Sequence, residues 1–393
     1  MSTFARFSAF SVWEHKQKDS LRESNRKVLF KRVIKKVMEI QSKIRIKDIA
    51  EMSGVSVGTV DRVLHGRTNV SKRALEKVQK VLDEINYVPN HYASALASNK
   101  THKFAAILPM HEADSYWARV EKGLVEGVKY FNDFKISFKI FQYDPFNDES
   151  FKAECDNLIE SQPDAVIIGP IFNFNIMKGF VDRLEENSLP YALLDSNWSE
   201  FNPVTFYGQD SLKSGEFSGR IMQMATKGDA NEIVIFRVMG EGRVASRQQM
   251  NREVGFRNYM KEHCPKCKIL DVNLYAYDKP GMKKILKTFF TQNPDVVYGL
   301  SFNSSIHLVG NFLASEMPSH KHVTLLGYDA VDANVKCIKE GKVDFLIAQH
   351  PHDQGLNCFR SMFNACVLHI KQKRDHYVSI ELLTKENIDF YTD

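Results

Sequence analysis

Short apolar runs alternate with amphipathic stretches through the last three quarters of the chain. Phe104–Leu108 precedes a helical pattern at 120–131, and Phe138–Phe141 precedes another at 151–159. Further continuous runs are Ala165–Gly169, Tyr191–Asp195, Ile233–Phe236, Val296–Leu300 and Val323–Gly327. Continuous apolar runs are typical of strands buried on both faces, as in parallel sheets covered by helices. With about 290 residues in this region, we expect an α/β fold with two parallel-sheet subdomains.

A different pattern lies between residues 44 and 64, where two short helical faces flank a Gly-Val-Ser turn. The first helix is expected to bury Ile46, Ile49, Ala50 and Met52. Gly54 gives the backbone freedom for the tight turn, and the Ser56 hydroxyl can cap the second helix. A helix-turn-helix of this kind places its second helix in the major groove of DNA. A structural helical hairpin has the same pattern, so the motif alone leaves both interpretations open.

A third helix completes the predicted N-terminal head. Residues 65–69 read as a loop, and Ser71 can cap the helix that follows. The apolar residues of that helix follow helical spacing: Leu75, Val78, Leu82 and Ile85. Pro89 cannot continue this helix but can open a new one at 91–98. We therefore expect a head of three helices followed by a short linker helix.

Charge is divided unevenly along the chain. The net charge is +5, but residues 1–100 hold 20 Lys and Arg against 10 Asp and Glu, whereas the remainder holds 33 against 38. The basic quarter coincides with the helix-turn-helix, and a phosphate backbone requires such a basic surface. The charge distribution therefore favours DNA binding over a structural bundle.

Composition and motifs exclude several other classes. No run approaches the ~20 apolar residues of a membrane helix, and no secretory block is present, so we expect a cytoplasmic protein without a membrane partner. Cys264 and Cys267 have ligand spacing but lack a second pair nearby, which indicates reduced thiols and no metal. The chain has no Ser-His-Asp elbow, no HExxH and no phosphate loop, and Gly240 and Gly242 lack the third glycine of a nucleotide fingerprint. We therefore expect neither an enzyme nor a cofactor.

Residues 1–43 form a basic extension ahead of the predicted head. Two alternatives account for it. Either translation starts naturally at Met38, so that residues 1–37 are not translated, or the extension is disordered or a loosely held helix that adds phosphate contacts.

Four segments between residues 44 and 98 carry a family resemblance: DIAEMSGVS, TVDRVLHGR, VSKRALEKV and INYVPN, in this order. Through them the region resembles the DNA-binding head and hinge of the lactose-repressor (LacI) family of bacterial transcription regulators. The resemblance implies a helix-turn-helix domain at 44–89 and a hinge helix and linker at 90–99, with Leu96 as a wedge in the minor groove. It implies that DNA is contacted by Val57, Gly58, Thr59, Asp61, Arg62, Arg67, Asn90 and Leu96.

Two residues of the second helix shape the expected base reading. Asp61 stands where the family commonly has a small residue, and its carboxylate near phosphate requires a cytosine amino group, Arg62 or Arg67 as a partner. Gly58 has no side chain with which to read a base. We therefore expect Arg62 to supply much of the direct readout, through guanine, and Val57 to touch a thymine methyl group.

Polar residues gather at the ends of the predicted strands. Ligands of open parallel sheets bind beyond the carboxyl ends of the strands, which makes these residues site candidates. They are His111, with Tyr116 and Trp117 nearby, Asp195, Asn197, the stretch 240–243, Asn303, Asp329 and Gln349. A sugar needs carboxylates, a forked arginine and an aromatic plate, because its hydroxyls donate and accept while its C–H faces are apolar. The alternative, that strand-end Asp and Asn residues cap helices, explains neither Arg252 nor Gln349.

Residues 101 to about 390 resemble the type I periplasmic-binding-protein fold, which is the sensor of LacI-family regulators and is shared with sugar-binding transport proteins. The resemblance is carried by LLDSN, NREVGFRNYM, SFNSS, LLGYD and FLIAQHPHDQG. It implies that sugar hydroxyls are bound by Asp195, Arg252, Asn303, Asp329 and Gln349. It also implies a sensor at 100–393, with one subdomain at about 100–208 and 350–377 and the other at about 209–349 and 378–393. His111 and Trp117 depart from the aromatic pair that monosaccharide-binding members use at this place.

We therefore expect a homodimeric transcription repressor that binds double-stranded operator DNA and senses a small sugar-like effector in the cleft between the subdomains. The alternative is a sugar-binding protein of the transport type, which would use the same cleft without DNA. The predicted head and the missing export signal argue against that alternative.

Overall fold

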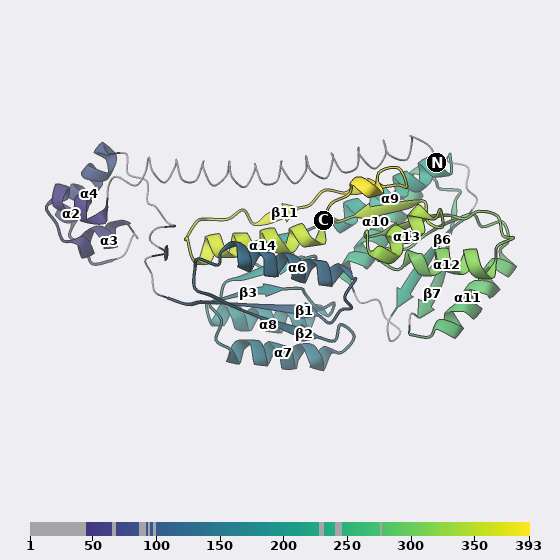
Figure 1. Ribbon diagram of the computed structural model, residues 1–393, viewed down its shortest axis with the longest axis horizontal. Coiled ribbons are helices and arrows are strands. Elements are labelled where there is room, and N and C mark those ends of the chain that lie inside the picture. Colours follow the sequence, from purple (N-terminus) through teal and green to yellow (C-terminus); the bar gives the residue numbers. More distant parts are fainter. Residues whose placement is uncertain are drawn as a thin grey trace, which may run out of the picture. The chain divides into compact units, whose positions relative to one another are not determined.

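The computed structural model describes residues 45–64, 68–85, 92, 95–96, 100–227, 232–239, 246–275 and 277–393. The chain divides into two units, Met1–Ser94 and Ala95–Asp393, and Figure 1 labels most of their helices and several of their strands. The predictions for residues 1–43, Arg67, Asn90 and the stretch 240–243 lie outside the described residues. None of the described helices combines the length and the apolar character that spanning a bilayer requires.

The described part of the first unit holds three helices: α2 (Ile46–Ser53), α3 (Val57–Leu64) and α4 (Lys72–Glu84). Each helix contributes a fully buried residue to one common core: Ile49, Val60 and Val78. The three helices pack together because each presents one apolar stripe. The predicted three-helix head is confirmed.

The turn between α2 and α3 also forms as predicted. Gly54 ends α2 with a φ of 63°, a left-handed conformation that glycine adopts without steric cost. The Ser56 hydroxyl oxygen accepts a hydrogen bond from the amide of Thr59 at 3.2 Å and so caps α3. Ser71 caps α4 in the same way, since its hydroxyl accepts from the amide of Ala74 at 3.3 Å.

The predicted burial of Met52 is wrong. Met52 is 50% exposed, whereas the neighbouring Ser53 is buried. Ile46, Ile49, Ala50 and Ser53 follow the spacing i, i+3, i+4, i+7 and share one face of α2. Met52 falls outside this stripe, so its apolar character does not bring it into the core.

The first sheet of the second unit has the strand order β11-β5-β4-β3-β1-β2, and all its strands are parallel. Its strands are β1 (His102–Pro109), β2 (Ile136–Tyr143), β3 (Ala165–Ile168), β4 (Tyr191–Leu194), β5 (Thr205–Gly208) and β11 (Asp375–Tyr377). Helices α6 (Tyr116–Tyr130) and α14 (Pro351–Cys366) cover one face, and α7 (Asp148–Glu160) and α8 (Phe174–Glu186) cover the other (Figure 1). We call this sheet and its helices the first subdomain.

The second sheet repeats this order as β12-β10-β9-β8-β6-β7, with β12 antiparallel to β10. Its strands are β6 (Glu232–Met239), β7 (Lys268–Tyr275), β8 (Tyr298–Leu300), β9 (Thr324–Tyr328), β10 (Phe345–Ala348) and β12 (Glu381–Leu383). Its helices are α9 (Ser211–Ala225) and α10 (Arg247–His263) on one face, and α11 (Lys279–Gln292), α12 (Ile306–Glu316) and α13 (Asp332–Lys339) on the other. A 3-10 turn, Ile388–Phe390, follows β12. This is the second subdomain.

Each central strand supplies side chains to two cores. In β1, Phe104 and Ala106 face α6 and α14, whereas Ala105 and Ile107 face α7 and α8. Because both faces of the strand are covered, an apolar residue is needed at every position. This explains the continuous apolar runs of the sequence, and the predicted α/β fold with two parallel-sheet subdomains is confirmed.

The helices next to the cleft pack in two glycine-mediated pairs. A Cβ atom on Gly123 of α6 would overlap the carbonyl oxygen of His352 in α14, and one on Gly355 of α14 would overlap that of Val120. In the second subdomain, a Cβ on Gly215 of α9 would overlap the carbonyl oxygen of Arg252 in α10. Only glycine permits such a close backbone approach. These contacts fix α6 and α10, which carry Tyr116 and Arg252 into the site described below.

The chain passes between the two sheets after β5, β10 and β11. Gln209, in the first of these crossings, ties all three together. Its side-chain amide donates to the carbonyl of Ala348 at 3.1 Å and to that of Ser379 at 3.0 Å. The crossings therefore form one hydrogen-bonded hinge at the side of the cleft.

Candidate functional site

The outward face of α3 is the first candidate site. Val57, Gly58 and Arg62 are exposed, and Asp61 is partly exposed, while Val60 faces the core. Thr59 is partly buried, and its hydroxyl lies 2.9 Å from that of Ser56. The face of α3 is therefore sterically available to a major groove, as the sequence predicts. Leu96, the predicted wedge, is 48% exposed.

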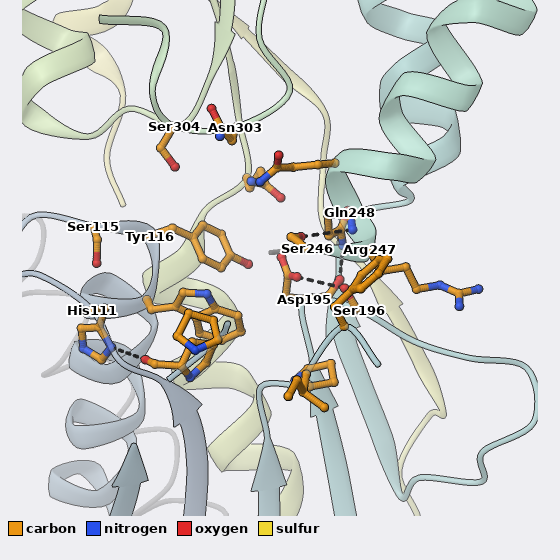
Figure 2. Close-up of a pocket in the computed structure, with 18 of the residues that line it drawn as sticks. His111, Ser115, Tyr116, Asp195, Ser196, Ser246, Arg247, Gln248, Asn303 and Ser304 are labelled. Carbon is orange, nitrogen blue, oxygen red and sulfur yellow. Dashed lines mark hydrogen bonds between the residues drawn. The ribbon is translucent and has the colours of Figure 1, made fainter. Parts of the chain in front are cut away.

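The second candidate site is a cleft of about 260 Å³ between the two subdomains. It lies at the carboxyl ends of the strands. Eight of the nine predicted ligand-binding residues line it: His111, Tyr116, Trp117, Asp195, Arg252, Asn303, Asp329 and Gln349. Figure 2 shows His111 and Ser115 on one side of the cleft and Asn303 and Ser304 on the other. The ninth, Asn197, lies outside the lining.

Two aspartates occupy matching places in the two subdomains. Asp195 follows β4 and Asp329 follows β9, and these strands hold the same position in their sheets. Both residues have left-handed backbones, with φ of 66° and 67°. Both are buried, and in the described part of the chain their carboxylates accept hydrogen bonds from side chains and from no helix amide. Neither carboxylate caps a helix, so each remains a candidate acceptor for ligand hydroxyls.

Asp195 accepts a hydrogen bond from the Ser196 hydroxyl at 3.0 Å. Burial raises the pKa of Asp195 from 3.8 to about 6, against the opposing effect of the Arg252 charge. Burial and the nearby Asp195 carboxylate also keep the pKa of Tyr116 well above its ordinary value. The Tyr116 hydroxyl therefore stays protonated, and Figure 2 shows it pointing toward Asp195.

Arg252 begins a relay of buried polar groups on the opposite wall. One of its guanidinium nitrogens donates to the Phe302 carbonyl at 3.0 Å, and another donates to the side-chain oxygen of Gln349. The Gln349 amide donates to Asp329 at 2.6 Å, and the Ser304 hydroxyl donates to the other oxygen of that carboxylate at 2.7 Å. Each member orients the next, so Arg252 holds Asp329 in place through Gln349.

Aromatic side chains form the apolar wall of the cleft. Trp117 meets Tyr116 edge to face, with ring centroids 5.3 Å apart. Trp198 is 2% exposed, and the Arg247 guanidinium lies 5.0 Å from its ring centroid. Figure 2 shows the Arg247 side chain extending away from Asp195. Trp117 and Trp198 thus supply apolar surface to this wall of the cleft.

Buried polar atoms without hydrogen-bond partners gather in this cleft. Among the residues that the structure describes, eight buried side-chain atoms lack a partner, and four of them belong to lining residues. These four are Trp198 Nε1, Arg247 Nε, Gln248 Oε1 and Arg252 Nε. Buried polar groups are nearly always paired in native proteins, so these four unpartnered atoms indicate that the cleft can bind a polar ligand.

Two predicted residues are engaged elsewhere. Asn197 donates to Asp375 at 3.1 Å, and its side-chain oxygen accepts from the amide of Trp198 at 2.8 Å, so it fastens the loop after β4 to β11. His111 lines the cleft, but its ring nitrogens lie 2.8 Å from the Pro109 carbonyl and 3.2 Å from Glu121. Both residues shape the walls through these contacts.

Sequence reasoning missed several lining residues. Ser196, Trp198 and Ser304 lie next to predicted residues at strand ends, and the strand-end rule extended by a few positions would have found them. Gln248 and Arg247 lie in the first turn of α10. Gln248 donates to the backbone carbonyl of Asp195 from the other subdomain, a contact that no local pattern reveals.

Two families match the chain when it is compared with known proteins. Residues 104–367, more than half of the chain, match the periplasmic binding protein domain. Residues 45–90 match the bacterial regulatory proteins of the lacI family. The matched ranges cover α2 to α4 and most of both sheets.

Among curated relatives, catabolite control protein A of Staphylococcus aureus is 26% identical over 187 residues, which are 47% of this chain and 54% of that protein. The chain thus matches about half the length of this relative. Among solved structures, a putative LacI transcriptional regulator from Bacteroides fragilis is 41% identical with a TM-score of 0.71, over 75% of this chain and 100% of that one. A solute binding protein of an ABC transporter from Burkholderia graminis, in complex with D-arabinose, has a TM-score of 0.67 at 16% identity, over 75% and 99% of the chains, which shows the fold alone.

Proposed function

Because the chain belongs to the LacI family of bacterial regulatory proteins and carries a periplasmic binding protein domain behind its DNA-binding head, we propose that it is a transcription regulator. It binds double-stranded operator DNA as a homodimer in the cytoplasm and represses transcription. A sugar-like effector binds in the cleft and changes the affinity for the operator by rotating one subdomain against the other. The sugar is bound and not turned over, so the protein is not an enzyme.

The unpartnered polar atoms in the cleft carry the effector part of this proposal. They lie beside two buried carboxylates, Asp195 and Asp329, and an aromatic wall. A sugar satisfies both features, because its hydroxyls donate to the carboxylates and accept from buried N–H groups while its apolar face packs on an indole ring. Two carboxylates beside the buried Arg252 also disfavour a highly phosphorylated ligand.

The exposed face of α3 carries the DNA part. One such helix reads one half-site, and two copies of the head placed on one face of the duplex read two, which is why a homodimer is proposed. A sugar-binding protein of the transport type would have no role for this basic DNA-binding head. The Bacteroides fragilis relative, whose match spans that whole chain, is itself named as a putative LacI transcriptional regulator.

Replacing Arg62 with alanine is expected to weaken operator binding by about 1–3 kcal/mol and to relax specificity at one base pair. Arg62 is exposed on α3, whereas Gly58 offers no side chain for base reading. The operator is first selected from random duplexes, and affinities are then measured by fluorescence anisotropy. Arg73→Ala, an exposed arginine on α4, is the control and should leave base preference unchanged. Equal weakening of Arg62→Ala on operator and random DNA would contradict the base-reading role.

Thermal unfolding with a panel of ligands tests the effector proposal. The panel contains neutral sugars, polyols, sugar acids and amino sugars. A true effector at 100 times its dissociation constant should stabilise the sensor by about 2.7 kcal/mol and raise the unfolding temperature. Asp195→Ala should lose that response. If no member of the panel raises the unfolding temperature, the sugar-sensor proposal is wrong.

Effector affinity is expected to fall on acidification. The pKa of Asp195 is raised to about 6 by burial, so the carboxylate is ionised at pH 7.5 and mostly protonated at pH 5. Only the ionised form accepts from two ligand hydroxyls, which predicts a loss of about tenfold in affinity between these values, as expected one pH unit below the pKa. Titration calorimetry at both pH values measures it. In Asp195→Asn, effector affinity should no longer depend on pH. If this variant still loses about tenfold in affinity between pH 7.5 and pH 5, Asp195 is not the titrating group.

A further inference from the structure

A group of charged residues joins the two subdomains beside the cleft. Asp114 and Arg119 belong to the first subdomain, at the loop after β1 and on α6, while Asp332 begins α13 in the second. Arg119 lies 3.1 Å from the Asp332 carboxylate, 3.4 Å from Asp114 and 3.7 Å from Asp393. We call these four residues the Arg119 cluster. It lies outside the lining of the cleft.

The cluster caps one helix of the second subdomain. The N-cap residue of α13, Val331, makes no side-chain cap. The amide of Asp332, in the first turn, instead donates to the carboxylate of Asp114 at 2.8 Å. A free amide at a helix N-terminus is satisfied by such an acceptor and favours negative charge. The cap of α13 is thus supplied from across the cleft.

A helix of the first subdomain is capped in the opposite direction. The N-cap residue of α14, His350, also makes no side-chain cap. Its amide donates to the Tyr391 hydroxyl at 3.2 Å, and the amide of His352 donates to Asp393 at 3.0 Å. Tyr391 packs against the core of the second subdomain. Each subdomain therefore caps a helix of the other, and Arg119 contacts the carboxylates of both caps.

The cluster is continuous with the effector cleft. Asp114 lies between His111 and Ser115, which line the cleft, and Asp332 lies three residues after Asp329. Asn334, in the first turn of α13, also donates to the backbone carbonyl of Asp329 at 3.0 Å. Both caps bridge the two subdomains, so a rotation that moves these elements apart breaks them.

From this geometry we propose that the Arg119 cluster is a closing latch, which favours the closed arrangement of the two subdomains before any ligand binds. Opening leaves two helix N-termini without acceptors and the buried Asp393 carboxylate, 3% exposed, without its cation. The latch sets the equilibrium between the open and the closed sensor. An effector can shift this equilibrium only by the difference between its affinities for the two arrangements. This inference does not depend on which ligand or DNA sequence is bound.

Hydrogen exchange of the full chain without ligand tests the latch. Asp114→Ala removes the cap of α13 and the contact between Asp114 and Arg119. Breaking the cap should raise the ratio of open to closed sensor about fivefold, the loss expected for one cap. Exchange should therefore speed up by a similar factor at the amide of His352, which Asp114 does not touch. Arg119→Ala should do the same at both caps. Faster exchange confined to residues 331–335, or no change, would overturn the latch.

Asp332→Ala is the matched control. Its carboxylate is 83% exposed and pairs with Arg119 at the surface, where an ion pair contributes little. The capped group is the backbone amide, which this substitution keeps. The latch therefore predicts near wild-type exchange at His352 in Asp332→Ala and faster exchange in Asp114→Ala. Equal effects of the two variants would contradict it.

Quenching of tryptophan fluorescence by acrylamide gives an independent readout. Trp117 and Trp198 line the cleft, and a Trp13→Phe background leaves only these two. The quenching constant should rise in Asp114→Ala and Arg119→Ala but not in Asp332→Ala. Unchanged quenching in all variants would argue against opening.

Discussion

Replacing Arg252 with alanine is expected to lower effector affinity about 10- to 100-fold, because the effector loses a charged hydrogen-bond donor, the unpartnered Nε, which contributes about 1.5–3 kcal/mol. Arg252 is 3% exposed, and its guanidinium donates to the Phe302 carbonyl and to Gln349. Without it, Gln349 no longer holds Asp329 in a fixed orientation. Titration calorimetry with the sugar found in the thermal panel measures the loss.

Arg257→Ala is the control for this prediction. Arg257 lies on the same helix, but it pairs with Glu253 and Asp271 and does not line the cleft. Its loss should leave the dissociation constant unchanged. Gln349→Met keeps Arg252 while removing the amide that joins it to Asp329, so it should also weaken binding even if Arg252→Ala folds poorly. Undiminished binding by both Arg252→Ala and Gln349→Met would refute the proposed site.

Replacing Gly123 with alanine is expected to destabilise the sensor by about 1–3 kcal/mol, the usual cost of overpacking. The added Cβ would overlap the carbonyl oxygen of His352 and approach the amide of Leu356 at 2.9 Å, so α6 and α14 must move apart. Both obstacles are backbone atoms, which have no rotamer to adjust. The unfolding temperature should fall by about 2–4 °C for each kcal/mol, measured by calorimetry.

Gly179→Ala provides the comparison. Gly179 lies within α8, and a Cβ there would meet no atom within 4 Å. Alanine is the better helix former by about 1 kcal/mol, so this variant should unfold at the same or a higher temperature. If Gly123→Ala and Gly179→Ala unfold at the same temperature, the glycine-mediated contact of α6 and α14 is not tight.

Seven strands could be predicted from their apolar runs, including the edge strand β2, whereas β5, β7, β10, β11 and β12 could not. Strands such as β1 and β9 are covered on both faces and require continuous apolar residues. β7 lies at the edge of its sheet and exposes Lys268 and Asp271 among its apolar residues, so its run is interrupted. β11 and β12 have only three residues each and depend on pairing with distant strands. Short strands of this kind leave no period to detect.

Most of the cleft could be predicted because parallel sheets bring all strand ends to one edge. This rule places Asp195 and Asp329 at strand ends of two different sheets, and the resemblance to the periplasmic-binding-protein fold implies that they share one cleft. Gln248 and Arg247 escaped it because they come from the first turn of a helix. The Arg119 cluster escaped it for a different reason. Asp114 and Asp332 are 218 residues apart, and their contact uses a backbone amide, which has no signature in the sequence.

The central claim is that a sugar in the cleft controls DNA binding by the head. The most direct measurement is operator affinity of the full chain with and without the sugar that stabilises it, in unaltered protein and in Arg252→Ala. The account predicts that saturating sugar changes operator affinity by roughly 5- to 150-fold in the unaltered chain and leaves it unchanged in Arg252→Ala. An operator affinity that stays the same while the sugar is bound would contradict the claim.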